Sequence, residues 1–198
     1  MFKLTGKGKI LSDKNIQLYT RYPLSSIFIY NGATLAHFLL GATGIVLGYN
    51  SLAGNIGGII YLAFALFEMY LHLPLKVCPN CVYYRLEDSL CISGLNLLSR
   101  KIAAEGDIED FSNRAKGLLC SNNLYIASLV IPVIAIIPTL IINFSIAVLG
   151  IFLALVALFA FRFFMLFTRI ACVHCRAKNI CPQAQQMFKD LKPTEQEG

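Results

Sequence analysis

Two Cys-x-x-Cys pairs carry the residue types in this chain that are best suited to chemistry. The first pair, Cys78 and Cys81, lies in the stretch LPLKVCPNCVYYR, and the second, Cys172 and Cys175, lies in FTRIACVHCRAK. Two thiolates at this spacing can bind one metal ion from a tight turn, and two pairs supply four ligands. A single pair can instead cycle between dithiol and disulfide and so exchange electrons.

Three other cysteines extend the possible ligand set. Cys91 follows the first pair, Cys181 follows the second, and Cys120 stands apart, while His174 lies inside the second pair. An even set of four cysteines favours zinc, whereas a surplus of thiols favours an iron–sulfur cluster, whose ligands are often followed by proline. The sequence therefore predicts a zinc or iron–sulfur centre with six metal ligands: Cys78, Cys81, Cys91, Cys172, Cys175 and Cys181.

Long apolar stretches must position these cysteines. The 198 residues are 57% hydrophobic and only 14% charged, well below the roughly 25% of charged residues in soluble domains. Apolar stretches of about 20 residues span a bilayer as helices, so we expect an all-α integral membrane protein with one membrane domain over residues 1–198. The four expected transmembrane helices cover residues 26–48, 56–75, 124–142 and 145–168. Short uncharged linkers join the first two and the last two, so each pair is expected to form a hairpin.

The positive charges lie on one side of the expected spans. Of the 17 lysines and arginines, all but Arg162 fall within residues 1–21, 76–116 and 169–192. Because lysine and arginine accumulate on the cytoplasmic side, both termini and segment 76–120 are expected in the cytoplasm, with the chain in the plasma or inner membrane. Thiols in a reducing compartment bind metal or cycle in redox reactions more often than they form structural disulfides. The net charge of +6 reflects this bias and gives no reason to expect a nucleic-acid partner.

The two halves of the chain correspond when one is shifted by 94 residues. FEMYLHLPLKVCPNC then lies over FRFFMLFTRIACVHC, which aligns the two Cys-x-x-Cys pairs and sets Glu68 opposite Arg162. Two such halves are expected to pack about a pseudo-twofold axis along the membrane normal. This 2+2 arrangement of hairpins predicts that both cysteine pairs lie near the axis and near each other.

Charged and titratable residues inside the expected spans indicate a second feature. Glu68 and Arg162 each precede a cysteine pair by ten residues, which places them at similar depth, and His37 on the first span lies near that depth. Intramembrane charges are costly, so they usually pair or face the bundle interior. We expect an ion pair between Glu68 and Arg162 with His37 nearby, forming a site where a quinone in the bilayer exchanges electrons with the centre.

The segment between the hairpins is too polar to span the membrane. Leucines and isoleucines between residues 86 and 98 predict an amphipathic helix on the membrane surface, and the acidic residues after Gly106 predict a second short helix. Together these helices are expected to cover the cysteines. The tail at residues 183–198 is polar and is expected to be disordered.

Two local resemblances bear on the chemistry. CPNC resembles the metal-binding knuckle of zinc ribbons and rubredoxins, although the glycine usual after the second cysteine is replaced by Val82 and Arg176. CPNCVYYR also resembles the active-site turn of the DsbB family of quinone-coupled thiol oxidoreductases. Vitamin K epoxide reductases share this coupling of thiol chemistry to a quinone. That resemblance implies a redox-active cysteine pair, a quinone and four membrane helices. The DsbB family places its cysteines on the oxidising side of the membrane, whereas the charge bias predicts a cytoplasmic location for the cysteines of this chain. The DsbB pair also precedes the second span, whereas Cys78 and Cys81 follow it.

Three functions therefore remain open. The first is a membrane electron-transfer component that carries a zinc or iron–sulfur centre and exchanges electrons with a redox protein or a quinone. The second is a thiol–disulfide oxidoreductase like those of the DsbB and vitamin K epoxide reductase families. The third is transport of soft metals along thiols, which is disfavoured because no cysteine lies within an expected span. Nothing resembles a Ser/His/Asp triad, a phosphate loop or a nucleic-acid module, so no catalytic residue is assigned.

Overall fold

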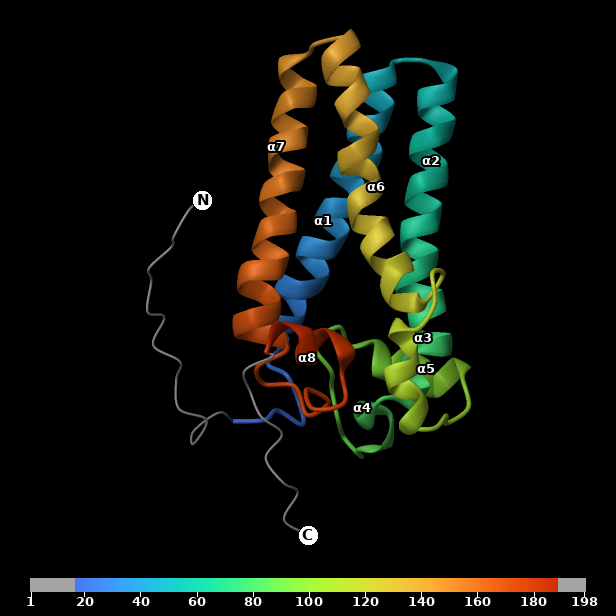
Figure 1. Cartoon of the computed structure of the whole chain (residues 1–198), viewed down its shortest axis with the longest axis vertical. Helices are drawn as coiled ribbons and strands as arrows, with labels where there is room; N and C mark the ends of the chain where they lie inside the picture. Colours follow the sequence, from blue (N-terminus) through green and yellow to red (C-terminus); the bar gives the residue numbers. More distant parts are fainter. Residues whose placement is uncertain (1–16, 189–198) are drawn as a thin grey trace.

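Four long apolar helices form the body of the part of the chain that the structure describes, and Figure 1 shows how they are arranged. The computed structural model describes residues 17–188. Within that part, four helical stretches are long and apolar enough to cross a membrane: Leu24–Tyr49, Leu52–Asn80, Ser121–Ile142 and Ile146–Ala171. They confirm the four spans expected from the sequence, with ends that differ by a few residues. Their α-helical parts are α1 (Leu24–Tyr49), α2 (Leu52–Phe67), α6 (Ser121–Ile142) and α7 (Ile146–Phe161).

Very short turns connect α1 to α2 and α6 to α7. Asn50 takes a left-handed conformation with φ 41° and ends α1, and the Ser51 hydroxyl accepts a hydrogen bond from the Gly54 amide at the start of α2. Such caps satisfy backbone groups that helix termini leave unpaired. Residues 143–145 connect α6 to α7. Both turns lie at the same end of the bundle (Figure 1), so the cysteine-bearing segments all lie at the other end.

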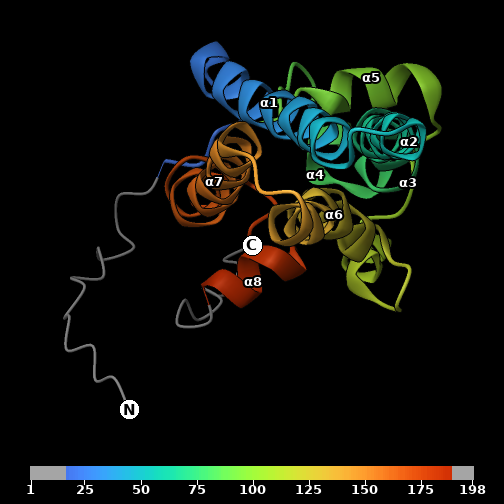
Figure 2. The ribbon, with the colours of Figure 1, turned by 90° about the horizontal axis from the view of Figure 1, so that it is seen from above.

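Helix α1 crosses the bundle and contacts α2, α6 and α7 (Figure 2). Its glycines allow the close approach to α6: a methyl group built on Gly41 would lie 2.7 Å from Pro132 Cβ, and one on Gly48 would lie 2.6 Å from Thr139 Oγ1. Small residues of this kind let membrane helices pack backbone to backbone. We call this α1–α6 contact the glycine seam.

The second and fourth spans change helical geometry at matching positions. α2 continues as the π-helical segment η2 (Glu68–His72) and then α3 (Leu73–Lys76), while α7 continues as η5 (Arg162–Ala171). π-helical turns are rare in proteins, but those that occur are often found at functional sites. Each π segment begins at one of the two intramembrane charges and leads into a Cys-x-x-Cys pair.

Short elements close the cysteine end of the bundle. They are η3 (Cys78–Asn80), α4 (Val82–Arg85), α5 (Leu95–Ile102), η4 (Glu109–Ala115) and α8 (Pro182–Met187). The amphipathic helix expected over residues 86–98 is present only as α5, because Leu90 pairs through its backbone with residues 20 and 22 and the residues on either side of it form turns. The short helix expected after Gly106 is present as η4.

The start of the tail also differs from expectation. Residues 183–187, expected to be disordered, belong to α8, with Pro182 in its first turn, where proline is well tolerated. Met187 packs against the main hydrophobic core, which explains the order of this short helix. Residues 189–198 lie outside the described residues.

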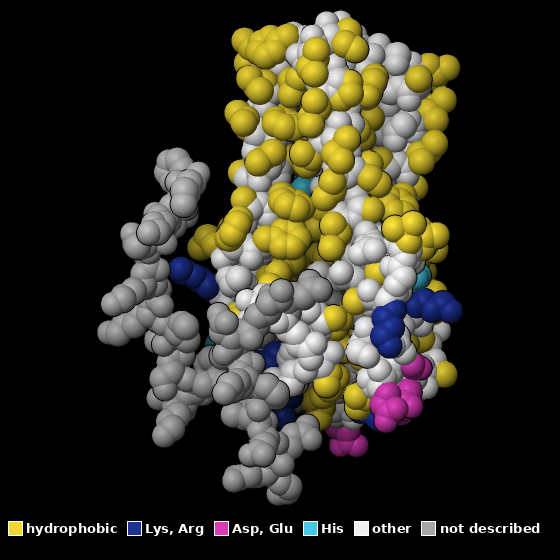
Figure 3. Space-filling view, in the orientation of Figure 1, with side chains coloured by type: hydrophobic (Ala, Val, Ile, Leu, Met, Phe, Trp, Pro, Cys, Tyr) yellow, Lys and Arg dark blue, Asp and Glu magenta, His cyan; other side chains and the backbone are white. Residues whose placement is uncertain are grey.

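Charged side chains gather at the cysteine end on the face seen in Figure 3, and the opposite end of that face is apolar. Many large apolar side chains on the helices are exposed, among them Phe28, Ile59 and Ile141. Exposed apolar surface on this scale is normal only where lipid or protein covers it. The bundle is therefore suited to a lipid bilayer.

Candidate functional site

Six of the seven cysteines line one cavity at the charged end of the bundle. The cavity has a volume of about 180 Å³. Its thiols come from both halves of the chain: Cys78, Cys81, Cys91, Cys172, Cys175 and Cys181. These are the six ligands expected from the sequence, and the structure brings all of them to the same cavity.

The two Cys-x-x-Cys pairs have the same local backbone turn. The Cys81 amide donates to the Cys78 carbonyl at 3.1 Å, and the Cys175 amide donates to the Cys172 carbonyl at 3.3 Å. Pro79 directly follows Cys78 and favours the turn of the first pair, because the proline ring fixes φ near the helical value. After Cys81 the chain enters α4, whereas after Cys175 it continues through further turns.

An extended segment near the N-terminus joins the cysteine regions of the two halves. The Tyr19 amide donates to the His174 carbonyl at 3.0 Å, and the Leu90 amide donates to the Thr20 carbonyl at 3.1 Å. The Tyr22 amide donates in turn to the Leu90 carbonyl at 2.9 Å. We call residues 19–22 the clasp. The clasp places the second cysteine pair beside Cys91, which follows Leu90 in the chain.

A buried polar network fixes the position of the first pair. Arg100 of α5 donates to the carbonyls of Tyr83 and Tyr84, each at 2.9 Å, and also to the carbonyl of Leu86. Asn96, which is 1% exposed, donates to the Ser89 carbonyl at 3.0 Å. These bonds satisfy carbonyls at the end of α4 that have no helical partner. α5 therefore holds α4, and with it Cys81, against the cavity.

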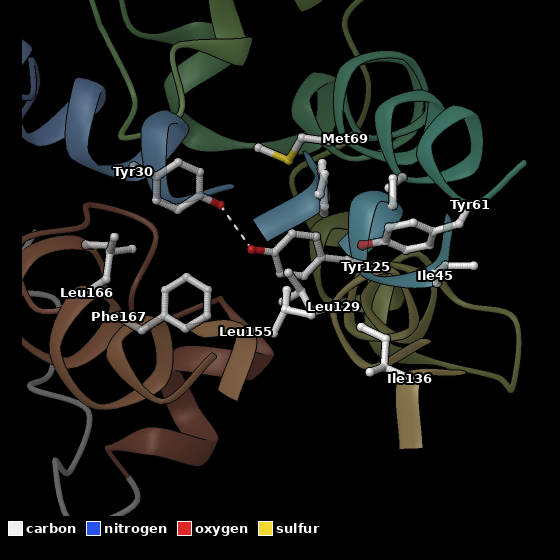
Figure 4. Packing of buried hydrophobic residues seen from close by; sticks show 14 of the residues in the cluster. Tyr30, Ile45, Tyr61, Met69, Tyr125, Leu129, Ile136, Leu155, Leu166 and Phe167 are labelled. Carbon is white, nitrogen blue, oxygen red and sulfur yellow. Dashed lines mark hydrogen bonds between the residues drawn. The ribbon is translucent and has the colours of Figure 1, made fainter. Parts of the chain in front are cut away.

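Aromatic side chains form much of the remaining cavity wall. They are Tyr22, Tyr30, Tyr83, Phe111, Tyr125 and Phe167. Figure 4 shows Tyr30 and Tyr125 pointing toward each other, with Phe167 alongside and Met69 on the other side; the two hydroxyls are 3.4 Å apart. The described residues that line the cavity include no acidic, basic or histidine side chain, so its wall is made of thiols, phenols, apolar groups and a few uncharged hydroxyl and amide side chains.

Burial raises the pKa of one thiol and of two phenols in this wall. The pKa of Cys175 is raised from 9.0 to about 11, chiefly by burial and to a smaller extent by the neighbouring Cys181 and Cys91. Burial likewise raises the pKa values of Tyr22 and Tyr83, to which the nearby Cys175 adds. Desolvation disfavours the charged form of an acid, so thiolates in this cavity require a compensating positive charge.

The cysteines surround the cavity without converging on a point. Among the described residues, no three histidine, cysteine or acidic side chains are placed so that they could hold a metal ion, and no disulfide joins the cysteines, all of which lie in that part. Cys120 is separate from the cavity: its sulfur accepts from the Asn123 amide at 3.4 Å at the start of α6. His174 stacks on Tyr19 with ring centroids 4.7 Å apart and bonds the Gln17 carbonyl, so it is not part of the wall.

The expected ion pair between Glu68 and Arg162 does not form. Glu68, 2% exposed, instead pairs with His72 one turn later, with Oε1 2.8 Å from Nδ1. Arg162, also 2% exposed, donates to the hydroxyls of Tyr125 and Thr34. The prediction was wrong because each group has a closer partner: the spacing of Glu68 and His72 places them on one helix face, and Arg162 faces α1 and α6.

His37 has a local partner as well. Its Nε2 lies 2.9 Å from the Leu129 carbonyl of α6, and the residue is 1% exposed. Among the described residues, His37, Glu68 and Arg162 are therefore all buried, yet none of them lines the cavity, and each has a different partner.

Sequence reasoning missed the clasp, the tyrosines and His72. The pairing of Glu68 with His72 is visible in the sequence as an i,i+4 spacing. The tyrosines gave no such signal, because their place at the cavity depends on contacts between distant segments.

Comparisons of the chain with protein-family models, curated proteins and solved structures return no match.

Proposed function

We propose that four of the six cysteines hold an iron–sulfur cluster and that the protein is a membrane electron-transfer component. Cluster ligands are cysteine thiolates, and six cysteines from four segments line one cavity. The cluster would join the two halves of the chain and would supply one-electron redox chemistry at the end of the bundle.

The distribution of the thiols carries this proposal. A single zinc ion needs four donors in a tetrahedron with bonds of about 2.3 Å, so its sulfurs must nearly touch. The described residues offer no three donors in such an arrangement, whereas a cavity of about 180 Å³ separates the six thiols. A cluster spaces its ligands around a core of several atoms, so this arrangement favours iron–sulfur over zinc.

The electron partners follow from the position of the site. The cavity is lined by Tyr30, Met69 and Tyr125 on the side of the membrane helices and by Cys81 and Cys181 at the charged end. A quinone in the bilayer would exchange electrons through the first side and a soluble redox protein through the second. Both partners are proposals that rest on this geometry.

We further propose that the cysteine end faces the cytoplasm of a plasma or inner membrane, with both termini on that side. The support is the gathering of charged side chains at this end (Figure 3) together with the positive-inside rule.

A 2+2 repeat of hairpins would explain why the site draws on both halves. The shift of 94 residues places Glu68 on Arg162, which are the first residues of the two π-helical segments. The same shift matches the two Cys-x-x-Cys turns, which share one backbone hydrogen-bond pattern. These agreements support the proposed repeat.

Metal analysis of protein purified without oxygen tests the cluster. We expect iron, acid-labile sulfide and a broad visible absorption that bleaches on reduction. Replacing Cys78, Cys81, Cys172 or Cys175 with serine should lower the iron content, while Cys120→Ser, outside the cavity, should not. Zinc without iron would move the assignment to a structural zinc site, and protein without either metal would overturn the proposal.

A thiol–disulfide oxidoreductase is the second candidate, favoured by the two Cys-x-x-Cys turns beside an aromatic, uncharged cavity. In that reaction one pair forms a disulfide and loses two electrons and two protons, and a quinone takes up both to become a quinol. Reaction of Cys78 or Cys172 with an impermeant reagent outside intact cells, in metal-free protein, would favour this candidate.

A further inference from the structure

Arg162 is a buried cation without a carboxylate partner. The ion pairs among the described residues join His72 to Glu68 and Arg85 to Glu105, so neither involves Arg162. Its guanidinium is held by the hydroxyls of Tyr125 and Thr34 and lies 5.2 Å from the Tyr30 ring centroid and 5.7 Å from that of Tyr125. Hydroxyls and ring faces stabilise a cation, but they carry no compensating net charge.

The same aromatic rings separate Arg162 from the cysteines. Tyr30, Tyr125 and Phe167 line the cavity, and the guanidinium lies over each of the three, 6.0 Å from the centroid of Phe167. The positive charge therefore lies one layer of rings behind the cavity wall. In a buried, uncharged environment such a charge is weakly screened, so it acts across this layer on whatever occupies the cavity.

We propose that Arg162 is the counter-charge of an anionic group in the cysteine cavity, and that it sets the reduction potential of the proposed cluster. This inference rests on the proposed function, because thiolate-ligated clusters carry net negative charge that increases on reduction. Cluster potentials depend on net charge, hydrogen bonds and solvent exposure. A fixed cation nearby favours the reduced, more negative state and raises the potential.

Redox titration of the full-length protein in detergent, followed by electron paramagnetic resonance, tests the role of the charge. Arg162→Gln should shift the potential to a more negative value by at least the equivalent of tenfold in equilibrium constant, about 59 mV for one electron. Arg162→Lys should shift it less. Arg169→Gln is the matched control, because Arg169 lies on the same segment η5 but is exposed, and it should leave the potential unchanged.

A second variant alters the charge of the Arg162 site through a residue of helix α1. Thr34→Asp places a carboxylate beside Arg162 and neutralises it, so it should lower the potential even if Arg162→Gln does not fold. Loss of the cluster from Arg162→Gln with retention in Arg162→Lys would also support a charge requirement.

Two results would overturn the inference. The first is an unchanged potential in Arg162→Gln or Thr34→Asp with the cluster retained, and the second is equal loss of the cluster from Arg162→Gln and Arg162→Lys. Both leave the proposed function intact, whereas absence of iron from the wild-type protein would remove the proposed function itself.

Discussion

The glycine seam gives the sharpest prediction about the fold, because two glycines of one helix differ completely in their surroundings. A methyl group on Gly48 would lie 2.6 Å from Thr139 Oγ1 and 3.0 Å from both Cβ and Cγ2 of that residue. A methyl group on Gly32 would meet nothing within 4 Å. Gly48→Ala and Gly32→Ala are therefore the same chemical change on α1 with and without a neighbour.

The magnitudes follow from two opposing effects. Alanine is favoured over glycine inside a helix by about 0.8–1 kcal/mol, which applies at both positions. Overpacking a tight contact costs about 1–3 kcal/mol, which applies only at Gly48. Thr139 cannot move aside easily, because it is 3% exposed and β-branched, and its hydroxyl donates to the Ile136 carbonyl at 2.7 Å. Gly48→Ala should therefore be less stable than Gly32→Ala by about 1–3 kcal/mol.

Unfolding of the detergent-solubilised protein by increasing fractions of sodium dodecyl sulfate, followed by circular dichroism, measures this difference. The cost of Gly48→Ala should fall in a Thr139→Ala background, because Oγ1 and Cγ2 of Thr139 are then gone and only its Cβ remains close to the added methyl group, so the two changes are coupled. Equal stability of the two alanine variants, or an undiminished cost in the double variant, would show that α1 and α6 do not pack through this seam.

Two further predictions concern the cysteine end. In iron-free protein, the thiolate fraction of Cys175 below pH 9 should be about a hundredfold smaller than that of a thiol with an ordinary pKa, because burial raises the pKa of Cys175 from 9.0 to about 11. The rate of Cys175 alkylation, measured by mass spectrometry, should therefore keep rising up to about pH 11. A plateau of that rate near pH 9 would contradict this prediction. Arg100→Gln should destabilise the protein by about 2 kcal/mol through the lost charged hydrogen bonds, seen as a lower melting temperature, whereas Lys101→Gln, at an exposed neighbouring position, should have little effect.

The membrane helices could be predicted from the sequence because lipid imposes a simple rule on them. A span must be apolar over its length, and only Glu68 and Arg162 interrupt that pattern as formal charges between residues 25–75 and 124–168. The shared location of the six cysteines could also be predicted, since each pair ends a span on the same side of the membrane. Periodicity overestimated the amphipathic helix, because pairing of Leu90 with the clasp overrides local helical preference.

Partners of the buried charges were harder to predict. Depth along a helix indicated that Glu68 and Arg162 lie at one level, but depth does not specify direction around the helix axis. That direction depends on the π-helical segments in which both residues lie, and the sequence pattern gives no sign of them. The clasp pairs residues that are far apart in the chain, so no local pattern could indicate it.

The clasp also determines the order in which this protein can be completed during its synthesis. Tyr19 is made early, yet its backbone partner His174 lies 155 positions later. At about 5–20 residues per second, the ribosome needs roughly 8–30 s to produce that partner. Until then the first cysteine pair lacks its opposing pair, and Tyr19 of the clasp lacks its partner His174, so the thiols cannot enclose anything. Loading of the proposed centre would therefore follow translation of the last membrane helix, and the early thiols would have to stay reduced and unoccupied during that interval.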